Sequence, residues 1–182
     1  MVLTQSYRKL NAGDKAPYFI LRGVDDRDHG MKEFFGKPTL VVFMCNHCPY
    51  VKAKISAIVK LKKAFGDKIN VIGVNSNDPD YEGEGFMNMK KFAREFKLNF
   101  HYLIDDSQKV ARSYGAVCTP DPFLFDADGK LVYHGRLDSS ASIEATTEGD
   151  IMETNIDSLL SGDRIKNDFL PSQGCSIKWK PV

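Results

Sequence analysis

The sequence has almost no excess of charge of either sign. It contains 25 Lys and Arg residues against 24 Asp and Glu residues, and its formal net charge is +1. Proteins that bind nucleic acids or anionic membranes usually carry a surplus or a run of basic side chains. We therefore expect no nucleic acid and no membrane among the partners of this chain.

The sequence also has no long hydrophobic stretch. No segment approaches the roughly 20 apolar residues that span a bilayer, and residues 1–9 contain no apolar run that could form the core of a signal peptide. We therefore expect a cytoplasmic protein. Its 182 residues, 42% hydrophobic and 27% charged, predict a single globular domain over residues 1–182, with a core at about 14–162 and a tail at 163–182.

Cysteine is scarce. The chain contains four, at Cys45, Cys48, Cys118 and Cys175. In a reducing compartment so small a set is a poor basis for a framework of structural disulfides. A close pair there is more commonly catalytic, redox-sensing or metal-binding. Cys45 and Cys48 are such a pair, and their chemistry depends on where they lie in the fold.

The residues around this pair predict a βαβ unit. Residues 39–44 form a continuous apolar run, which is typical of a strand buried on both faces. From Val51 to Phe65 apolar residues recur every three or four positions, which predicts an amphipathic helix whose lysines, Lys54 among them, lie on a solvated face. Residues 69–74 form a second apolar run. A strand, a helix and a strand in this order predict parallel pairing.

The rest of the chain continues the alternation of strands and helices. The pattern predicts helices at about 86–96, 106–114 and 150–160, a strand at 100–104, and a hairpin of residues 123–125 and 131–133. We expect Asp106 to cap the second of these helices and Gly115 to end it. The tail from residue 164 to 182 shows no clear period and is expected to wrap over the domain as an extended chain.

The Cys-x-x-Cys motif lies between the predicted strand and the predicted helix. The N-terminus of a helix offers free backbone N–H groups and about half a positive charge, so a cysteine there has a lowered pKa and a populated thiolate. Pro49 fits this place because proline is favoured in the first turn of a helix. His47 can stabilise the thiolate further. One thiolate can then form a mixed disulfide that its neighbour resolves, which is typical of a thioredoxin-like redox motif.

Two other interpretations of the motif stay open. The pair can be half of a zinc site completed by His47 or Cys118, which would make the protein a metal-binding module without enzymatic activity. Structural zinc sites usually contain a second Cys or His pair at close spacing, however, and none is visible in this sequence. The pair can also be two inert cysteines. The place between a strand and a helix favours the redox interpretation over both.

Two segments resemble thioredoxin-like and peroxiredoxin proteins. Residues 35–49, FGKPTLVVFMCNHCP, resemble the segment that opens the active site in these families. Residues 115–126, GAVCTPDPFLFD, resemble their cis-proline loop and the strand that follows it. The similarity extends over about residues 14–137. It implies an α/β protein of the thioredoxin fold, with a central mixed β-sheet flanked by helices and a peroxiredoxin-like N-terminal extension.

The resemblance also implies roles for particular residues. It implies a cis bond before Pro120, with Pro122 as the rival position, although most X–Pro bonds are trans. The Thr119–Pro120 segment would hold a substrate strand by backbone hydrogen bonds. Cys45 would be the exposed attacking thiolate, and Cys48 the more buried resolving partner.

The similarity is closest to peroxiredoxin-like proteins that carry Cys-x-x-Cys where the peroxidases carry Thr-x-x-Cys. In that comparison Cys48 occupies the position of the peroxidatic cysteine, and Cys45 that of the threonine that orients peroxide. Residues 118–123 also lack the arginine of the peroxidases. We therefore expect thiol–disulfide exchange as the activity. A thiol peroxidase is the alternative, in which Cys48 becomes a sulfenic acid and Cys45 resolves it.

The remaining expectations concern partners and the other two cysteines. The substrate is expected to be a protein or small-molecule disulfide, or a peroxide under the alternative, and a cellular thiol is expected to supply electrons. No cofactor and no metal are expected. Cys118 either packs as a small apolar residue or forms an alternative disulfide. Cys175, in the tail, either offers a resolving thiol or stands apart from the motif.

Overall fold

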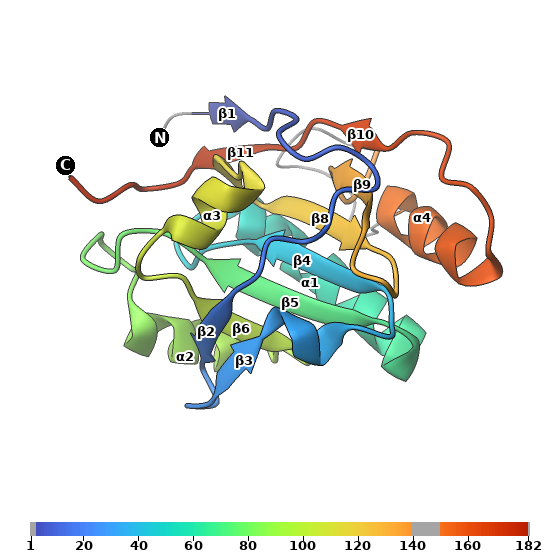
Figure 1. Ribbon diagram of the computed structural model, residues 1–182. Helices are drawn as coiled ribbons and strands as arrows, with labels where there is room; N and C mark the ends of the chain where they lie inside the picture. Colours follow the sequence, from blue (N-terminus) through green and yellow to red (C-terminus); the bar gives the residue numbers. More distant parts are fainter. Residues whose placement is uncertain (1–2, 140–149, 182) are drawn as a thin grey trace.

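In the computed structural model, which describes residues 3–139 and 150–181, eight strands form one mixed sheet at the centre of the protein (Figure 1). The order of the strands is β10-β9-β8-β4-β5-β6-β2-β3. β4, β5 and β6 are parallel, whereas β8 is antiparallel to β4 and β9 is antiparallel to β8. The bounds of the strands are Ile20–Gly23 (β2), Asp28–Gly30 (β3), Thr39–Phe43 (β4), Asn70–Asn75 (β5), His101–Ile104 (β6), Asp121–Phe125 (β8), Leu131–Gly135 (β9) and Phe169–Leu170 (β10).

Helices cover both faces of this sheet. Side chains of α1 (Pro49–Phe65), α2 (Phe86–Glu95) and α4 (Asp150–Ser161) share one buried apolar cluster with one face. The other face packs against α3 (Lys109–Tyr114) and the short 3-10 helix η1 (Met31–Phe34). A second 3-10 helix, η2 (Gly66–Lys68), follows α1. The expected α/β class, with a central mixed sheet flanked by helices, is confirmed.

β4 carries the cysteine motif beyond its carboxyl end. All five residues of β4 are buried, and the strand lies between β5 and β8 in the middle of the sheet. Val41 of β4 is in register with Ile72 of β5, and α1 connects these two parallel strands. The predicted βαβ unit is therefore confirmed, with bounds one or two residues away from those expected.

Segments from near both ends of the chain meet in a second, smaller sheet (Figure 1). Its strands are β1 (Leu3–Gln5), β11 (Gln173–Ser176) and β7 (Cys118–Thr119), in the antiparallel order β1-β11-β7. The tail that was expected to be an extended wrap thus forms two short strands, β10 and β11. Because β11 lies beside β7, the smaller sheet brings the tail to the predicted cis-proline loop.

The predicted cap of the third helix was wrong. α3 begins after Gln108, not after Asp106. The preceding Asp105 is fully buried, and its Oδ2 accepts hydrogen bonds from the Ser76 hydroxyl at 2.8 Å and the Ala111 N–H at 2.9 Å. Asp105, one residue before the expected Asp106, therefore accepts a backbone N–H of the first turn of α3.

The expectation that Lys54 lies on a solvated face of α1 was also wrong. Lys54 is only 4% exposed, and its Nζ lies 2.7 and 2.8 Å from the two carboxylate oxygens of the buried Asp138. A lysine can be buried where a carboxylate compensates its charge. The segment after β9 supplies that carboxylate, which the helical period of α1 does not reveal.

Candidate active site

The turn between β4 and α1 places the cysteine motif at the start of a helix. Cys48 is the N-cap of α1 and Pro49 is its first residue, as the sequence predicts. Unpaired backbone N–H groups and the positive end of the helix dipole lie at this point. Cys45 and Cys48 are 1% and 0% exposed, so their thiols lie beneath the surface.

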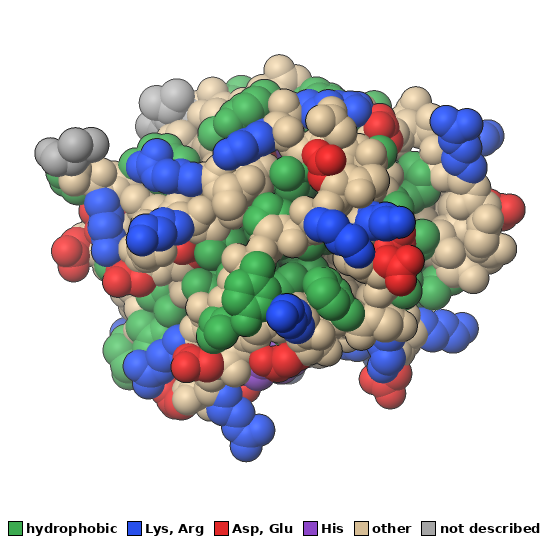
Figure 2. All heavy atoms as spheres, viewed as in Figure 1, with side chains coloured by type: hydrophobic (Ala, Val, Ile, Leu, Met, Phe, Trp, Pro, Cys, Tyr) green, Lys and Arg blue, Asp and Glu red, His purple; other side chains and the backbone are tan. Residues whose placement is uncertain are grey.

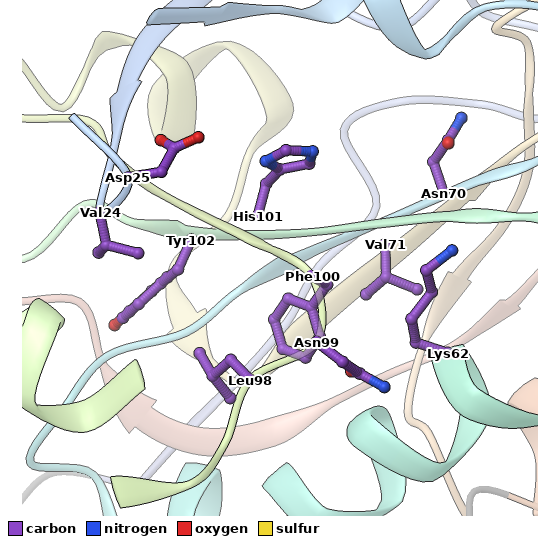
Figure 3. A pocket seen from close by; sticks show the side chains of 10 residues that line it. All are labelled: Val24, Asp25, Lys62, Asn70, Val71, Leu98, Asn99, Phe100, His101 and Tyr102. Carbon is purple, nitrogen blue, oxygen red and sulfur yellow. The ribbon is translucent and has the colours of Figure 1, made fainter. Parts of the chain in front are cut away.

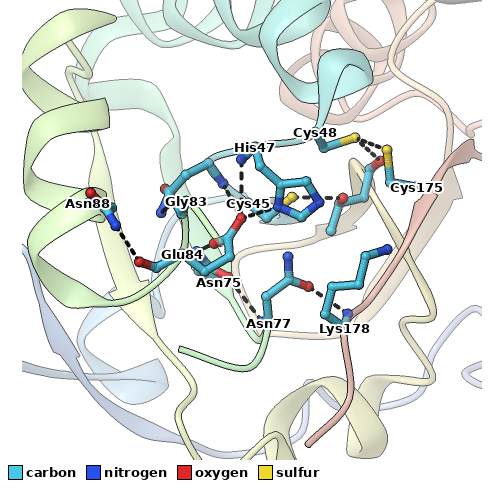
Figure 4. A network of polar contacts seen from close by, with 12 residues as sticks. Cys45, His47, Cys48, Asn75, Asn77, Gly83, Glu84, Asn88, Cys175 and Lys178 are labelled. Atoms are coloured by element: carbon cyan, nitrogen blue, oxygen red, sulfur yellow. Dashed lines mark hydrogen bonds and ion pairs between the residues drawn. The ribbon is translucent and has the colours of Figure 1, made fainter. Parts of the chain in front are cut away.

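Cys48 lies among groups that stabilise its thiolate (Figure 4). Its Sγ lies 2.7 Å from Sγ of Cys175. When protonated, the Cys48 thiol donates to the carbonyl oxygen of Thr119 at 3.4 Å, a contact that favours the thiol and not the thiolate. A hydrogen bond from Cys45 lowers the pKa of Cys48 most, and burial opposes this effect. Hydrogen bonds from the Cys175 thiol and from the backbone of Val51 and Cys175 lower the pKa further, to about 5.

Cys45 has the opposite electrostatic surroundings. Burial, the neighbouring Cys48 and the charge of Glu84 raise the pKa of Cys45 well above its ordinary value. Its Sγ lies 3.2 Å from Oγ1 of Thr119. The two pKa shifts therefore run opposite to the order that the resemblance implied, in which Cys45 is the attacking thiolate. The reason is that Cys48 occupies the N-cap of α1, whereas Cys45 faces a buried carboxylate.

The Thr119–Pro120 peptide bond is cis, so the prediction that Pro120 carries the cis bond is confirmed. Thr119 reaches both sulfurs, with its hydroxyl at Cys45 and its carbonyl oxygen at Cys48. The backbone of Thr119 is paired in register with Cys175 of β11. The strand edge that was expected to hold a substrate is therefore occupied by the tail of the same chain.

A buried carboxylate, Glu84, holds the turn of the motif from the other side (Figure 4). Its Oε1 accepts hydrogen bonds from the backbone N–H groups of Asn46 and His47, at 3.1 Å each, and pairs with Nδ1 of His47. Its Oε2 accepts a hydrogen bond from the Asn75 amide at 2.7 Å. Burial acts to raise the pKa of Glu84, but the hydrogen bonds from His47 and Asn75 outweigh it and leave the pKa below its ordinary value.

His47 is directed to this carboxylate. Its Nδ1 pairs with Glu84, and its ring lies 4.9 Å from the ring of Tyr81 between centroids. It was expected to stabilise the thiolate, and instead it helps to fix the turn. Sequence reasoning missed Glu84, because a single acidic residue between Gly83 and Gly85 in a loop carries no pattern that points to the motif.

Cys118 is fully buried in β7, and its thiol is free. Burial raises the pKa of Cys118 well above its ordinary value, and the charge of Asp121 adds to this effect. Such a thiol is a weak nucleophile. The surroundings of Cys118 agree with the interpretation that it packs as a small apolar residue.

Two groups of side chains in the described part of the chain could hold a metal ion. They are Cys45 with His47 and Glu84, and Asp25 with His29 and His101, and within each group the possible ligand atoms lie within 4.8 Å of one another. In the first group a metal would displace the proton between His47 and Glu84 and the proton of Cys45, because ligands bind in their deprotonated forms. Metal binding there would compete with redox chemistry for Cys45.

The cavity shown in Figure 3 lies apart from the cysteines. It has a volume of about 380 Å³ and is lined by residues of α1, β5, β6 and the neighbouring loops, among them Lys62, Val71 and His101. None of its ten lining side chains is a cysteine. It is therefore not the place where the thiols react.

The surface agrees with the balanced composition of the chain. Figure 2 shows Lys and Arg side chains interspersed with Asp and Glu side chains on the face that it presents. Within residues 3–139 and 150–181, no helix combines the length and the apolar character that crossing a membrane requires.

Known proteins of similar sequence and structure include thiol-disulfide oxidoreductases. The chain is 24% identical over 125 residues to the thiol-disulfide oxidoreductase ResA of Bacillus thuringiensis, which covers 68% of this chain and 69% of that protein. An uncharacterized conserved protein from Geobacillus kaustophilus is 37% identical, with a TM-score of 0.94 over 100% of this chain and 98% of that one. The thioredoxin domain of a thiol-disulfide oxidoreductase from Bacteroides vulgatus is 25% identical, with a TM-score of 0.61 over 69% and 89% of the two chains.

These neighbours confirm the thioredoxin fold. The model of the AhpC/TSA family matches residues 12–134, which include the cysteine motif, the cis-proline loop and the sheet between them. This match extends over more than half of the chain. The protein belongs to the AhpC/TSA family.

Proposed function

We propose that this thiol–disulfide oxidoreductase reacts through Cys48 as its nucleophile, with Cys45 as a resolving thiol. The observation that carries the proposal is the place of Cys48 at the N-cap of α1, where Cys45, Cys175 and the backbone of Val51 stabilise its thiolate. Relatives that share most of the chain's length are named thiol-disulfide oxidoreductases, which supports the class of reaction.

The proposed reaction has two steps. The Cys48 thiolate attacks one sulfur of a substrate disulfide, the substrate S–S bond breaks, and one substrate sulfur leaves as a thiolate while the other is joined to Cys48. Cys45 then loses its proton to the departing thiolate and attacks Sγ of Cys48. The second substrate thiolate leaves, and Cys45 and Cys48 form a disulfide. A cellular thiol returns two electrons and completes the cycle.

Thr119 and Pro120 form the proposed substrate-binding wall. Thr119 contacts both sulfurs of the motif. Its backbone pairs with the extended strand β11, so its edge can accept an extended chain. A substrate strand that took this edge would bring its disulfide to Cys48. The thiols of Cys45 and Cys48 supply both electrons that reduce the substrate disulfide, so the proposed reaction requires no cofactor.

The test compares Cys48→Ser, Cys45→Ser/Cys175→Ser and Cys118→Ser as a matched buried control. We expect Cys48→Ser to lose at least 99% of the rate at which the protein reduces a protein disulfide, and Cys118→Ser to keep it. The Cys45→Ser/Cys175→Ser variant, which keeps neither thiol beside Cys48, should accumulate a mixed disulfide with the substrate, visible by mass spectrometry. If Cys48→Ser accumulates the mixed disulfide instead, the order of the two cysteines is the reverse of the one proposed.

The low pKa of Cys48 also favours a second candidate function, reduction of peroxide. The thiolate would attack a peroxide oxygen and become a sulfenic acid, and Cys45 would resolve it with loss of water. Against it, Cys45 stands where peroxidases have threonine. A sulfenic acid trapped on Cys48 in the Cys45→Ser/Cys175→Ser variant, with turnover of peroxide in the wild type, would support this candidate. An antioxidant role and a cytoplasmic location stay predictions from the sequence.

A further inference from the structure

The sulfur of Cys175 lies against the sulfur of Cys48. The two Sγ atoms are 2.7 Å apart, and Cys175 is only 1% exposed. A disulfide bond is about 2.05 Å long, so the two sulfurs need to approach by less than 1 Å to form one. Figure 4 shows Cys48 and Cys175 pointing toward one another from α1 and from the tail.

The fold holds Cys175 in this place from both sides. β11 pairs with β1 through Leu3 and Cys175 and with β7 through Cys175 and Thr119. The N–H of Ile177 donates to the carbonyl of Val117 at 2.9 Å, which continues the pairing with the segment before β7. The thiol is therefore presented by the central strand of a sheet, although it lies in the tail of the chain.

A glycine makes this close approach possible. A Cβ at Gly174 would lie 2.0 Å from the carbonyl oxygen of Thr119, a distance that no side chain can occupy. Gly174 thus lets β11 rest directly on the cis-proline loop. Its neighbour Cys175 reaches the place where the sulfur of a bound substrate strand would meet Cys48.

The electrostatic surroundings favour a protonated Cys175 beside a Cys48 thiolate. Burial and the hydrogen bond to Cys48 raise the pKa of Cys175 to about 12, so Cys175 keeps its proton and donates it toward the Cys48 thiolate. When Cys48 is consumed in a mixed disulfide, its negative charge disappears. That charge is one of the causes of the raised pKa of Cys175, so its loss makes Cys175 easier to deprotonate.

We propose that Cys175 is a third redox residue, which resolves the mixed disulfide on Cys48, and that β11 acts as a substrate strand built into the chain. This inference rests on the proposed function of Cys48 as the nucleophile. It assigns the tail a catalytic task, since the sulfur of Cys175 forms a bond with the reacting sulfur.

The proposed step balances as a thiol–disulfide exchange. Cys175 gives its proton to the substrate thiolate that left first and attacks Sγ of Cys48. The bond between Cys48 and the remaining substrate sulfur breaks, this sulfur leaves as a thiolate, and Cys48 and Cys175 form a disulfide. Cys45 can then attack Cys48, which moves the disulfide to Cys45 and Cys48 and returns a proton to Cys175. Two electrons pass to the substrate in total.

The first experiment maps the disulfides of the Cys45→Ser variant after treatment with oxidised glutathione. This variant is needed because no trypsin site separates Cys45 from Cys48 in the sequence. We expect one bridge, between Cys48 and Cys175, in more than 80% of the molecules, reversible by dithiothreitol. The Cys45→Ser/Cys175→Ser variant should stop at a glutathione adduct on Cys48. The same adduct in Cys45→Ser, with Cys175 as a free thiol, would overturn the proposal.

The second experiment keeps the thiols of Cys48, Cys118 and Cys175 and displaces β11. Gly174→Ala should slow formation of the Cys48–Cys175 bridge at least tenfold in the Cys45→Ser background. Gly30→Ala is the matched control, because a Cβ at Gly30 would meet its neighbours at 3.6 Å or more, and it should leave the rate unchanged. Circular dichroism checks that both variants fold. Equal rates in both variants would contradict the role assigned to the placement of β11.

Activity separates this inference from the proposed function. If the wild type reduces a protein disulfide in a Cys48-dependent manner, but no bridge to Cys175 forms, the inference fails and the proposed function stands. If the bridge forms but the wild type reduces no disulfide, the proposed function fails. If both hold, Cys175→Ser should lower turnover several-fold and lengthen the lifetime of the mixed disulfide on Cys48, whereas Gly30→Ala should change neither.

Discussion

The pKa of Cys48 is lowered by the groups around it although its side chain is fully buried. Its thiolate is held by the end of α1 and by two other thiols, and its full burial means that each of these partners acts with little screening. Contacts of single atoms thus determine the pKa of Cys48, and the pH dependence of the reduction potential should reveal their effect.

The first prediction concerns the pH dependence of that potential. Since the pKa of Cys48 is lowered to about 5 and that of Cys45 is raised, reduction of their disulfide takes up one proton above pH about 5 and two below it. The potential should fall by about 30 mV per pH unit above this break and by about 60 mV below it. Equilibration with a thiol buffer at pH 4 to 8 measures the slopes. A slope of about 60 mV throughout this range would show that Cys48 is a neutral thiol.

Cys175→Ser serves as the internal check of this prediction. The thiol of Cys175 lowers the pKa of Cys48 through a hydrogen bond. In the Cys175→Ser variant the serine hydroxyl would donate this hydrogen bond with a different geometry. We expect the break in slope to move to a different pH in this variant, whereas Cys118→Ser should leave it in place.

For single residues, the sequence predicted where the cysteine pair lies in the fold but not which groups surround it. The spacing of Cys45 and Cys48 and the proline after them located the pair and the helix that begins there. The pKa shifts of the pair depend on Glu84 and Cys175, which lie 36 and 127 residues from Cys48 along the chain. No local pattern reveals a partner that only the fold brings near.

The turn between β4 and α1 is the element on which the site depends. Glu84 accepts both N–H groups of the two residues between the cysteines, and the loop before α2 presents it. The conformation of the motif therefore depends on an acceptor, Glu84, that lies in another loop. The sequence of the motif itself does not reveal this acceptor.

Glu84→Gln tests this dependence. The Gln amide would place an N–H₂ group against a donor of the motif or against the Asn75 amide, so one buried donor loses its acceptor. We expect a loss of about 1–3 kcal/mol in the free energy of unfolding, and a lower pKa of Cys45, because the charge of Glu84 helps to raise it. Urea unfolding and the ultraviolet absorbance of the thiolates measure the two effects.

Glu82→Gln is the matched control, because Glu82 is an exposed carboxylate of the same loop. It should change the free energy of unfolding by less than about 0.5 kcal/mol. If Glu84→Gln has no larger effect than this control, the carboxylate does not hold the turn.

Elements with a long, regular pattern were predictable. β4 could be predicted from a continuous apolar run, and α1 from apolar residues at helical spacing. Both patterns are easy to recognise because the two elements contain five and 17 residues. β7 and β11 have two and four residues and owe their place to pairing with distant strands. The site was therefore predictable where it depends on α1, and unpredictable where it depends on the smaller sheet.

The molecule as a whole covers its own active site. β1, β11 and β7 bring the two ends of the chain over the cysteine motif, and the salt bridge between Arg8 and Asp168, at 2.7 Å, joins the segments that flank β1 and β11. Ser6 and Ser172 exchange two further hydrogen bonds of 2.9 and 2.8 Å. A substrate strand must therefore displace β11 to pair with Thr119, and the stability of the smaller sheet sets how often that happens.

The last prediction follows from this competition. Deleting residues 1–5 removes β1, so β11 keeps a partner strand on one side only. We expect amide exchange in residues 173–176 to rise at least about tenfold, while β4 and β5, in the centre of the larger sheet, exchange as before. Hydrogen exchange read by mass spectrometry measures both. Because an opened β11 uncovers Thr119 and withdraws Cys175, the same deletion should speed attack by Cys48 on a protein disulfide and slow formation of the Cys48–Cys175 bridge. A deletion that leaves both rates and the exchange unchanged would mean that β1 does not restrain the tail.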